Sequence, residues 1–322
     1  MNKFKYYFIL IITTLSLFSC SKDDNTVESV PLRDFAEQFT ADNATIEQYL
    51  KTYYIDITDP DFADKDVIIE KITDADTQPS IYSYLNKDTF PKLLSREVKQ
   101  HDIVYTIYYL VLREGTGDAP CNVDGVLAAY KGQYLTESTV SEVTTLTSTL
   151  FEEVKYPQQA NKLTGVVQGW SEIFPKFKTG SYTENNDGTV SYSDFGAGVM
   201  FLPSGMGYYA QGASSIPSYS PLVFSFKLYA IQRFDQDGDG VPSYLEDING
   251  DGYMSYLATG VENPDDTDGD GIPNYADIDD DGDGYNTKIE IKDPLTGLPY
   301  EFDQIPTCTS GVKNFLDATC HP

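Results

Sequence analysis

Apolar side chains recur at helical spacing between Pro31 and Tyr54, and the segment that follows is mixed. The apolar positions are Leu32, Phe35, Phe39, Ile46, Tyr49, Leu50 and Tyr53. Residues three and four apart share one face of a helix, so the pattern predicts a packing helix with a break near Asp42 and Asn43. Residues 56–100 predict one strand and several turns.

Aromatic and β-branched side chains dominate the next part of the chain. Such runs favour strands. The predicted strands are Ile103–Leu112, Val126–Tyr134, Val199–Leu202 and Leu222–Gln232. Trp170–Phe177 predicts a short apolar helix, and Asn186-Asp187-Gly188 predicts a hairpin turn within an extra segment, residues 181–198. One helix among antiparallel strands predicts an α+β domain over about residues 100–233.

The first residues have the pattern of an export signal. Lys3 and Lys5 precede the apolar run Phe8–Phe18, which is too short to span a bilayer, so residues 1–19 predict a signal peptide. The sequence Leu17-Phe18-Ser19-Cys20 resembles the lipobox of bacterial lipoproteins. That resemblance implies two acyl chains on Cys20, which would hold the protein on a membrane. The alternative is an ordinary secretory signal with a chance cysteine.

Residues 20–30 predict a polar tether. Within it, Ser21-Lys22-Asp23-Asp24 resembles the acidic tag of Bacteroidetes-type lipoproteins. The resemblance implies a place in the bacterial envelope, at the outer membrane, with display on the cell surface.

Composition excludes several function classes. With 40 % hydrophobic residues the chain can bury a core, which excludes general disorder. A net charge of −28 repels phosphate backbones and excludes nucleic acid as a partner. Only two histidines, His101 and His321, are present, which disfavours a multi-histidine metal site and a Ser-His-Asp hydrolase.

Three cysteines remain after Cys20. Cys308 and Cys320 lie close together near the C-terminus, and an exported chain permits a disulfide between them. Cys121 is then expected to be a small buried hydrophobe. Three reduced thiols are the alternative.

Residues 235–293 contain 18 Asp or Glu and only two Lys, in four copies of an Asp-x-Asp/Asn-x-Asp-Gly pattern. Alternate carboxylates in a tight turn direct their oxygens at one point, and the carbonyl at position seven and an acid at position twelve complete a shell of hard oxygens. This chemistry favours structural Ca²⁺ and disfavours soft metals. The second loop has Ala258 at position twelve and is expected to bind more weakly.

The predicted metal ligands are Asp235, Asp237, Asp239, Val241, Glu246, Asp247, Asn249, Asp251, Asp266, Asp268, Asp270, Ile272, Asp277, Asp279, Asp281, Asp283, Tyr285 and Glu290. The close spacing of the loops resembles thrombospondin type 3 repeats, a family in which the chain wraps around a string of calcium ions. A disordered acidic tail is the alternative interpretation.

Five ordered blocks between residues 111 and 232 resemble FKBP-type peptidyl-prolyl cis-trans isomerases. The blocks are Val111–Gly117, Val126–Gly132, Val166–Trp170, Phe201–Ser204 with Tyr208, and Ile216–Ser218 with Leu222–Phe224. The resemblance implies a half-open antiparallel β-sheet that wraps a short helix. It also implies catalysis without a cofactor on proline-containing segments of exported proteins.

The resemblance also assigns roles to residues. It places Trp170 under the proline ring, and it gives peptide carbonyls hydrogen bonds from the Tyr208 hydroxyl and the Ile216 N–H. The site it implies comprises Tyr130, Phe151, Glu152, Val166, Val167, Trp170, Tyr208, Ile216 and Phe224. For an isolated Tyr or Phe among these, core packing is the competing interpretation.

The chain departs from the family pattern at Asn161, where many members have an aromatic residue, and at Glu152, where an aspartate is usual. These departures put the catalytic rate in doubt, and they leave open a surface binding or adhesion protein with a degenerate isomerase-like module on a calcium-stiffened stalk. A calcium-dependent part of a larger envelope complex is a third alternative. The predicted divisions are 1–19 signal peptide, 20–30 tether, 31–100 helical and mixed region, 101–233 isomerase-like domain, 235–293 calcium repeats and 294–322 tail.

Overall fold

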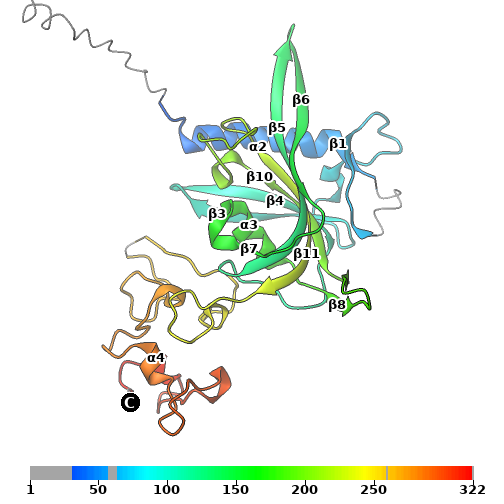
Figure 1. The fold of residues 1–322 in the computed structure, drawn as a ribbon. Helices are drawn as coiled ribbons and strands as arrows, with labels where there is room; N and C mark the ends of the chain where they lie inside the picture. Colours follow the sequence, from blue (N-terminus) through cyan, green and yellow to red (C-terminus); the bar gives the residue numbers. More distant parts are fainter. Residues whose placement is uncertain (1–30, 57–63, 259, 321–322) are drawn as a thin grey trace, which may run out of the picture. The chain divides into compact units, whose positions relative to one another are not determined.

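The computed structural model describes residues 31–56, 64–258 and 260–320 (Figure 1), and the described residues from Asp34 onward belong to one unit. The predicted signal peptide, the Cys20 anchor and the tether lie outside the described residues. In the part of the chain that the structure describes, no helix has both the length and the apolar content needed to cross a membrane.

A curled antiparallel sheet forms the centre of the fold. Its strands are β3 (Lys92–Gln100), β4 (Ile103–Arg113), β5 (Gly125–Val140), β6 (Val143–Val154), β7 (Asn161–Lys162), β10 (Gly196–Leu202) and β11 (Leu222–Gln232). The order across the sheet is β3-β4-β10-β11-β5-β6, with β7 paired to β5. The prediction was an α+β fold, and its coarser part is confirmed: a few helices with a mostly antiparallel, curled sheet. The sheet begins at Lys92, so one of its strands lies in the region predicted to precede the domain.

The central strands of this sheet, β4, β10 and β11, bury side chains on both faces. On β4, Tyr105, Ile107 and Tyr109 face one core, and Leu110 and Leu112 face another. Successive side chains of a strand point to opposite faces, so a strand covered on both sides must be apolar throughout. This explains why every residue of β10 is buried.

Each face is covered by one helix. The short helix α3 (Gln168–Ile173) continues into the 3₁₀ turn η4 (Phe174–Lys176), and its side chains fill the first core. The long helix α2 (Phe35–Thr52) packs against the second core through Ile46, Tyr49 and Leu50. The side chain of Asp34 begins α2 by accepting hydrogen bonds from the N–H groups of Ala36 and Glu37.

The predicted break in this first helix is wrong. α2 runs unbroken through Asp42 because that carboxylate is fully used inside the protein. One oxygen accepts a hydrogen bond of 2.6 Å from Gln38, and the other accepts from the N–H and hydroxyl of Ser204 at 2.7 and 2.6 Å. A buried polar side chain with these partners stabilises the helix where it would otherwise interrupt it.

Two small strand pairs and one long hairpin lie at the margins of the sheet. β1 (Tyr53–Ile55) pairs with β2 (Ile69–Lys71), and β8 (Ser181–Glu184) pairs with β9 (Val190–Ser193) around the predicted 186–188 turn. β5 and β6 continue past the sheet as a long hairpin (Figure 1). The 3₁₀ turns η2 (Ile81–Tyr84), η3 (Leu163–Gly165) and η5 (Ser204–Met206) complete this half of the unit.

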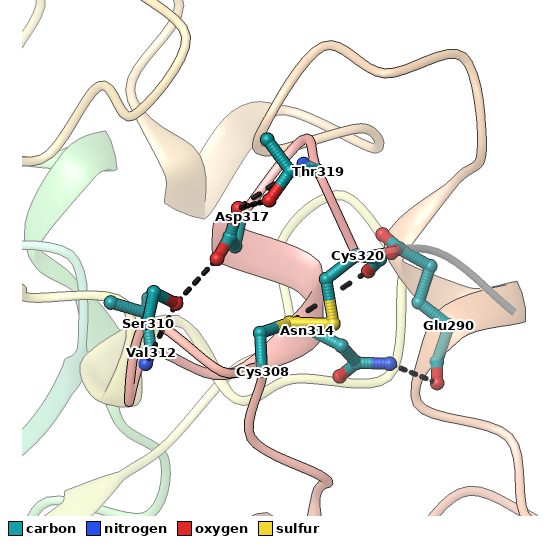
Figure 2. The surroundings of a disulfide bond; sticks show 8 residues. All are labelled: Glu290, Cys308, Ser310, Val312, Asn314, Asp317, Thr319 and Cys320. Atoms are coloured by element: carbon teal, nitrogen blue, oxygen red, sulfur yellow. Dashed lines mark hydrogen bonds between the residues drawn. A yellow bond between two sulfur atoms is a disulfide. The ribbon is translucent and has the colours of Figure 1, made fainter.

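The acidic C-terminal segment has little regular structure. Its elements are η6 (Ser243–Leu245), η7 (Asn274–Ala276), α4 (Thr287–Glu290), η8 (Phe302–Gln304) and η9 (Asn314–Leu316). A small apolar cluster of Val241, Ile291, Ile305 and Phe315 joins its parts. A disulfide links Cys308 to Cys320, and Asn314 between them donates a hydrogen bond to the Glu290 carbonyl (Figure 2). Cys121 is a buried free thiol.

Candidate functional site

An aromatic hollow of about 400 Å³ opens between β5, β6, α3 and the segment after β10. It is lined by Tyr130, Phe151, Glu152, Asn161, Gly165, Val166, Val167, Trp170, Gly207, Tyr208 and Phe224. Eight of the nine residues that the resemblance assigns to the site are therefore brought together, although they come from distant parts of the chain.

Trp170 forms the floor of this hollow. It lies in the first turn of α3, is only 4 % exposed, and meets Tyr130 and Phe224 edge to face, with ring centroids 4.9 and 5.4 Å apart. The preceding residue, Gly169, allows this placement, since a Cβ atom there would overlap the side chain of Leu202 on β10. Perpendicular ring pairs of this kind add stability beyond the burial of area, so the floor is rigid.

One wall depends on the absence of a side chain in β5. A Cβ atom at Gly132 would lie 2.5 Å from Phe151 and 2.9 Å from Phe224. These two rings meet edge to face at 5.6 Å across that space. Gly132 thus lets the rings of β6 and β11 close the wall without filling the hollow.

Two tyrosine hydroxyls are among the polar groups of the hollow. Tyr130 donates a hydrogen bond of 2.9 Å to the carboxylate of Glu152, and Tyr208 lies at the rim with 37 % of its surface exposed. Burial first, and then the charge of Glu152, raises the pKa of both phenols above the ordinary value of 10. Both hydroxyls therefore remain protonated donors at neutral pH.

Ile216 does not take the place that the resemblance implies. It does not line the hollow, and its N–H donates a hydrogen bond of 2.7 Å to the Ala213 carbonyl, which closes a small loop. The donor expected for a peptide carbonyl is thus already used within the chain, and its role toward a peptide stays a prediction. Asn161, in contrast, does line the hollow, so the departure from the family pattern falls inside the site.

The four acidic loops share one hydrogen-bonding scheme. In each, one carboxylate oxygen of the first aspartate accepts from the N–H of the glycine at position six, at 2.8–3.2 Å; the pairs are Asp235 with Gly240, Asp247 with Gly252, Asp266 with Gly271, and Asp279 with Gly284. These glycines have φ between 86° and 106°, a backbone conformation in which a residue with a side chain would be strained. Sequence and backbone thus agree on a sharp turn.

The scheme leaves carboxylate oxygens directed inward. Ligand oxygens of Asp235, Asp237 and Asp239 lie within 4.8 Å of one another, as do those of Asp266, Asp268 and Asp270, and those of Asp279, Asp281 and Asp283. Three of the four predicted loops therefore gather their acids. The carbonyl positions Val241, Ile272 and Tyr285 follow the glycines of these loops.

The position-twelve residues differ among the loops. Glu246 and Glu290 are buried, and the pKa of each is raised by burial and by the neighbouring aspartates, to about 10 for Glu246 and about 8 for Glu290. The pKa of Asp277 in the third loop is raised for the same reasons. A raised pKa means that the ionised carboxylate is unfavourable in this environment unless a cation lies beside it.

Two buried acids beside the loops were not identified by the sequence pattern. Asp265 is 1 % exposed and accepts a hydrogen bond of 2.9 Å from the Ile248 N–H, beside the second loop with Asp247 and Asp251. Asp280 lies with Asp239 and Glu246. Both fall next to a loop aspartate in sequence, outside the alternating positions, so spacing alone gave no signal for them.

The second loop is bonded directly to the sheet domain. Asn122 forms a reciprocal pair with Met254, donating to its carbonyl at 2.6 Å and accepting from its N–H at 2.9 Å. The Tyr253 hydroxyl donates to the Glu172 carbonyl in α3 at 2.7 Å, and the Arg96 guanidinium lies 3.6 Å from the centre of the Tyr253 ring. The acidic segment is therefore attached to the helix that carries Trp170.

Comparisons with known proteins give one family match in the acidic segment and distant likenesses to solved structures. A family model described as BamM C-terminal matches residues 236–314, about a quarter of the chain. Similar solved structures include a peptidyl-prolyl cis-trans isomerase from Pseudomonas syringae pv. tomato, 17 % identical over 63 % of this chain and 99 % of that one, with a TM-score of 0.33. FkpA from Escherichia coli is 26 % identical over 39 % of this chain and 48 % of that one, with a TM-score of 0.28. No curated protein matches the chain. At these TM-scores the likenesses assign no chemistry to the chain.

Proposed function

We propose that the chain is an FKBP-type peptidyl-prolyl cis-trans isomerase that acts on proline-containing segments of exported proteins. The observation that carries this proposal is the hollow itself, floored by Trp170 and walled by the rings of Phe151 and Phe224. Its size suits a proline side chain with its flanking peptide groups, and the Tyr208 hydroxyl stands at the rim, where those groups would pass.

The chemistry needs no nucleophile or cofactor. Rotation about an X-Pro bond breaks amide resonance, which gives a barrier of about 18–20 kcal/mol. The twisted amide has a smaller dipole than the planar one, so an apolar pocket disfavours the ground state more than the transition state. Tyr208 donates to a carbonyl of the peptide and holds it across the ring floor. Binding the twisted form more tightly than the planar form is sufficient to accelerate the reaction.

A protease-coupled assay on a proline tetrapeptide tests the proposal. We expect Tyr208→Phe to reduce kcat/KM several-fold and Trp170→Leu to abolish activity, with Tyr182→Phe on β8, 65 % exposed and outside the hollow, as the matched control. Circular dichroism checks that each variant is folded. Background rates in the wild-type chain would refute the enzymatic proposal.

A second candidate function is peptide binding without catalysis. Asn161 within the hollow and the occupied N–H of Ile216 both favour it, because each removes a feature of the family's site. Fluorescence of Trp170 separates the two candidates, since it is the single tryptophan of the chain. A proline peptide that changes this fluorescence but whose isomerisation is not accelerated indicates a binding module.

We propose further that the acidic loops bind Ca²⁺. Three gathered sets of carboxylates, hard oxygens only and buried acids at position twelve support this assignment. The ions would stiffen the segment and take no part in the isomerisation. A calorimetric titration of the full chain in which no Ca²⁺ binds would refute it.

A place at the outer membrane, with a lipid anchor on Cys20, completes the proposal. The match to the BamM C-terminal family model supports an envelope location, and the lipobox-like sequence supports the anchor. Labelling with a radioactive fatty acid tests it. Label that persists in Cys20→Ser would contradict the anchor.

A further inference from the structure

Three buried carboxylates meet at a point between two loops that are distant in sequence. Asp239 and Glu246 belong to the first loop, and Asp280 belongs to the fourth. Their exposed fractions are 2, 0 and 1 %, and one ligand oxygen from each lies within 4.8 Å of the others. The meeting point is therefore a closed site built by parts of the chain that only the fold brings together.

Asp280 does not join the carboxylates of its own loop. Its neighbours Asp279 and Asp281 gather with Asp283, whereas Asp280 gathers with Asp239 and Glu246 of the first loop. Its N–H points to the Thr287 hydroxyl at 3.4 Å. The side chain is thus left to the first loop.

The oxygens at this point have no donors. Both oxygens of Glu246, both of Asp280 and Oδ2 of Asp239 are buried without a hydrogen-bond partner among the described residues. The other Asp239 oxygen accepts from the Val241 N–H at 2.7 Å. Leaving five buried carboxylate oxygens without a hydrogen-bond donor costs free energy. This cost favours a bound cation at this point.

A protein cation does not fill this role. Lys288 is the basic side chain that comes near, but its ammonium donates to the Gly238 carbonyl at 3.1 Å. In the described part of the chain, the ion pairs lie elsewhere, at Glu47, Glu114, Glu172, Asp66 and Asp124. The charge of the three carboxylates is therefore not balanced by the chain itself.

The spacing fits one metal ion. Calcium holds its oxygen ligands at about 2.3–2.6 Å, so two ligands of the same ion lie at most about 5 Å apart. The carboxylate oxygens meet that limit. Asp237, whose Oδ2 is also buried and without a partner among the described residues, belongs to the adjoining set with Asp239.

We propose that Asp280 is a ligand from the fourth loop to the calcium ion of the first loop, so that one ion joins the two. This inference rests on the proposed calcium binding and extends it. The first loop then cannot be complete without the fourth, and calcium closes the acidic segment as one unit in place of four independent loops. Sequence pattern assigns Asp280 to no site, because it stands at position two of its loop.

Calorimetric titration of the full chain with Ca²⁺ tests the inference. We expect Asp280→Asn to weaken one site at least tenfold or to remove it. The matched control is Glu301→Gln, an exposed acid that lies outside the four loops, which should leave the number and affinity of the sites unchanged. Asp268→Asn serves as a comparison within the third loop, where it should affect a different site.

The outcomes separate the two proposals. A wild-type chain that binds no Ca²⁺ defeats both. A wild-type chain that binds Ca²⁺, with Asp280→Asn binding it equally well in number and affinity, overturns the bridging role and leaves calcium binding intact.

Hydrogen exchange on the wild-type chain gives a second measurement if Asp280→Asn fails to fold. Peptides covering residues 235–246 and 279–290 should gain protection at one common Ca²⁺ concentration. Separate midpoints for the two loops would overturn the bridge.

Discussion

The Tyr253 hydroxyl donates a hydrogen bond of 2.7 Å to the backbone carbonyl of Glu172. The donor belongs to the second acidic loop, and the acceptor lies two residues after Trp170 in α3. The ring of Tyr253 is also covered by Arg96, whose guanidinium forms an ion pair of 2.9 Å with the Glu172 carboxylate. The acidic segment and the floor of the hollow therefore share a set of contacts.

We expect Tyr253→Ala to loosen this junction and to lower isomerase activity, because α3 loses a hydrogen bond and Arg96 of β3 loses its contact with the ring. Each contact is worth about 0.5–1.5 kcal/mol. Tyr253→Phe keeps the ring and should have the smaller effect. Thermal unfolding and kcat/KM measure both, with Tyr256→Phe, a more exposed tyrosine of the same segment, as the control. Equal activity in all three variants would show that the junction does not support the floor.

Asp42 ties the first helix to the rim of the hollow. We expect Asp42→Ala to destabilise the protein by about 2–3 kcal/mol, because the Ser204 N–H would be left buried without an acceptor. Ser204 begins the turn that leads to Tyr208, so KM for a proline peptide should also rise. Urea unfolding and steady-state kinetics measure the two effects.

Asp42→Asn provides the comparison for that variant, since it keeps an acceptor oxygen and should lose less stability. An Asp42→Ala chain as stable as wild type would mean that the helix is held by its apolar face alone.

Calcium binding should depend on pH in a defined direction. Burial raises the pKa of Glu246 to about 10 and that of Asp280 to about 9, so without calcium both hold protons at pH 7. Calcium must displace these protons, and its affinity should rise with pH. Titrations in two buffers of different protonation enthalpy measure the protons released. An affinity that does not change between pH 6 and pH 9 would contradict these protonation states.

The same shifts set the stability of the chain in the presence of a chelator. The folded state binds these protons more tightly than the unfolded state, in which the pKa of a glutamate is about 4.5. The contribution of these groups to the free energy of unfolding is therefore fully present below about pH 4.5 and is lost as the pH rises toward 9–10. We expect a lower unfolding temperature at pH 8.5 than at pH 6 with chelator, and a smaller difference with calcium.

Local pattern predicted most of the fold. β11 has the predicted bounds, and the 181–198 segment forms the expected hairpin, because strand alternation and the Asn-Asp-Gly turn are properties of neighbouring residues. The break at Asp42 was predicted wrongly because its hydrogen-bond partner, Ser204, lies far along the chain. A polar residue inside a helix looks like an interruption until that distant partner is known.

The candidate site, too, could be predicted from the sequence only in part. Tyr130, Trp170 and Phe224 could be located because each stands in a block whose order resembles a known family, and the fold brings them to one hollow. The use of the Ile216 N–H by Ala213, and the position of Asp280 beside the first loop, follow from loop closure and chain packing. Neither leaves a periodic signal in the sequence.

The most direct test of the account is the exchange rate between cis and trans forms of a proline tetrapeptide, measured by NMR exchange spectroscopy with catalytic amounts of the full chain. We expect exchange well above the uncatalysed rate, a several-fold reduction with Tyr208→Phe, and wild-type exchange with Tyr182→Phe. Exchange at the uncatalysed rate with the folded wild-type chain would contradict it.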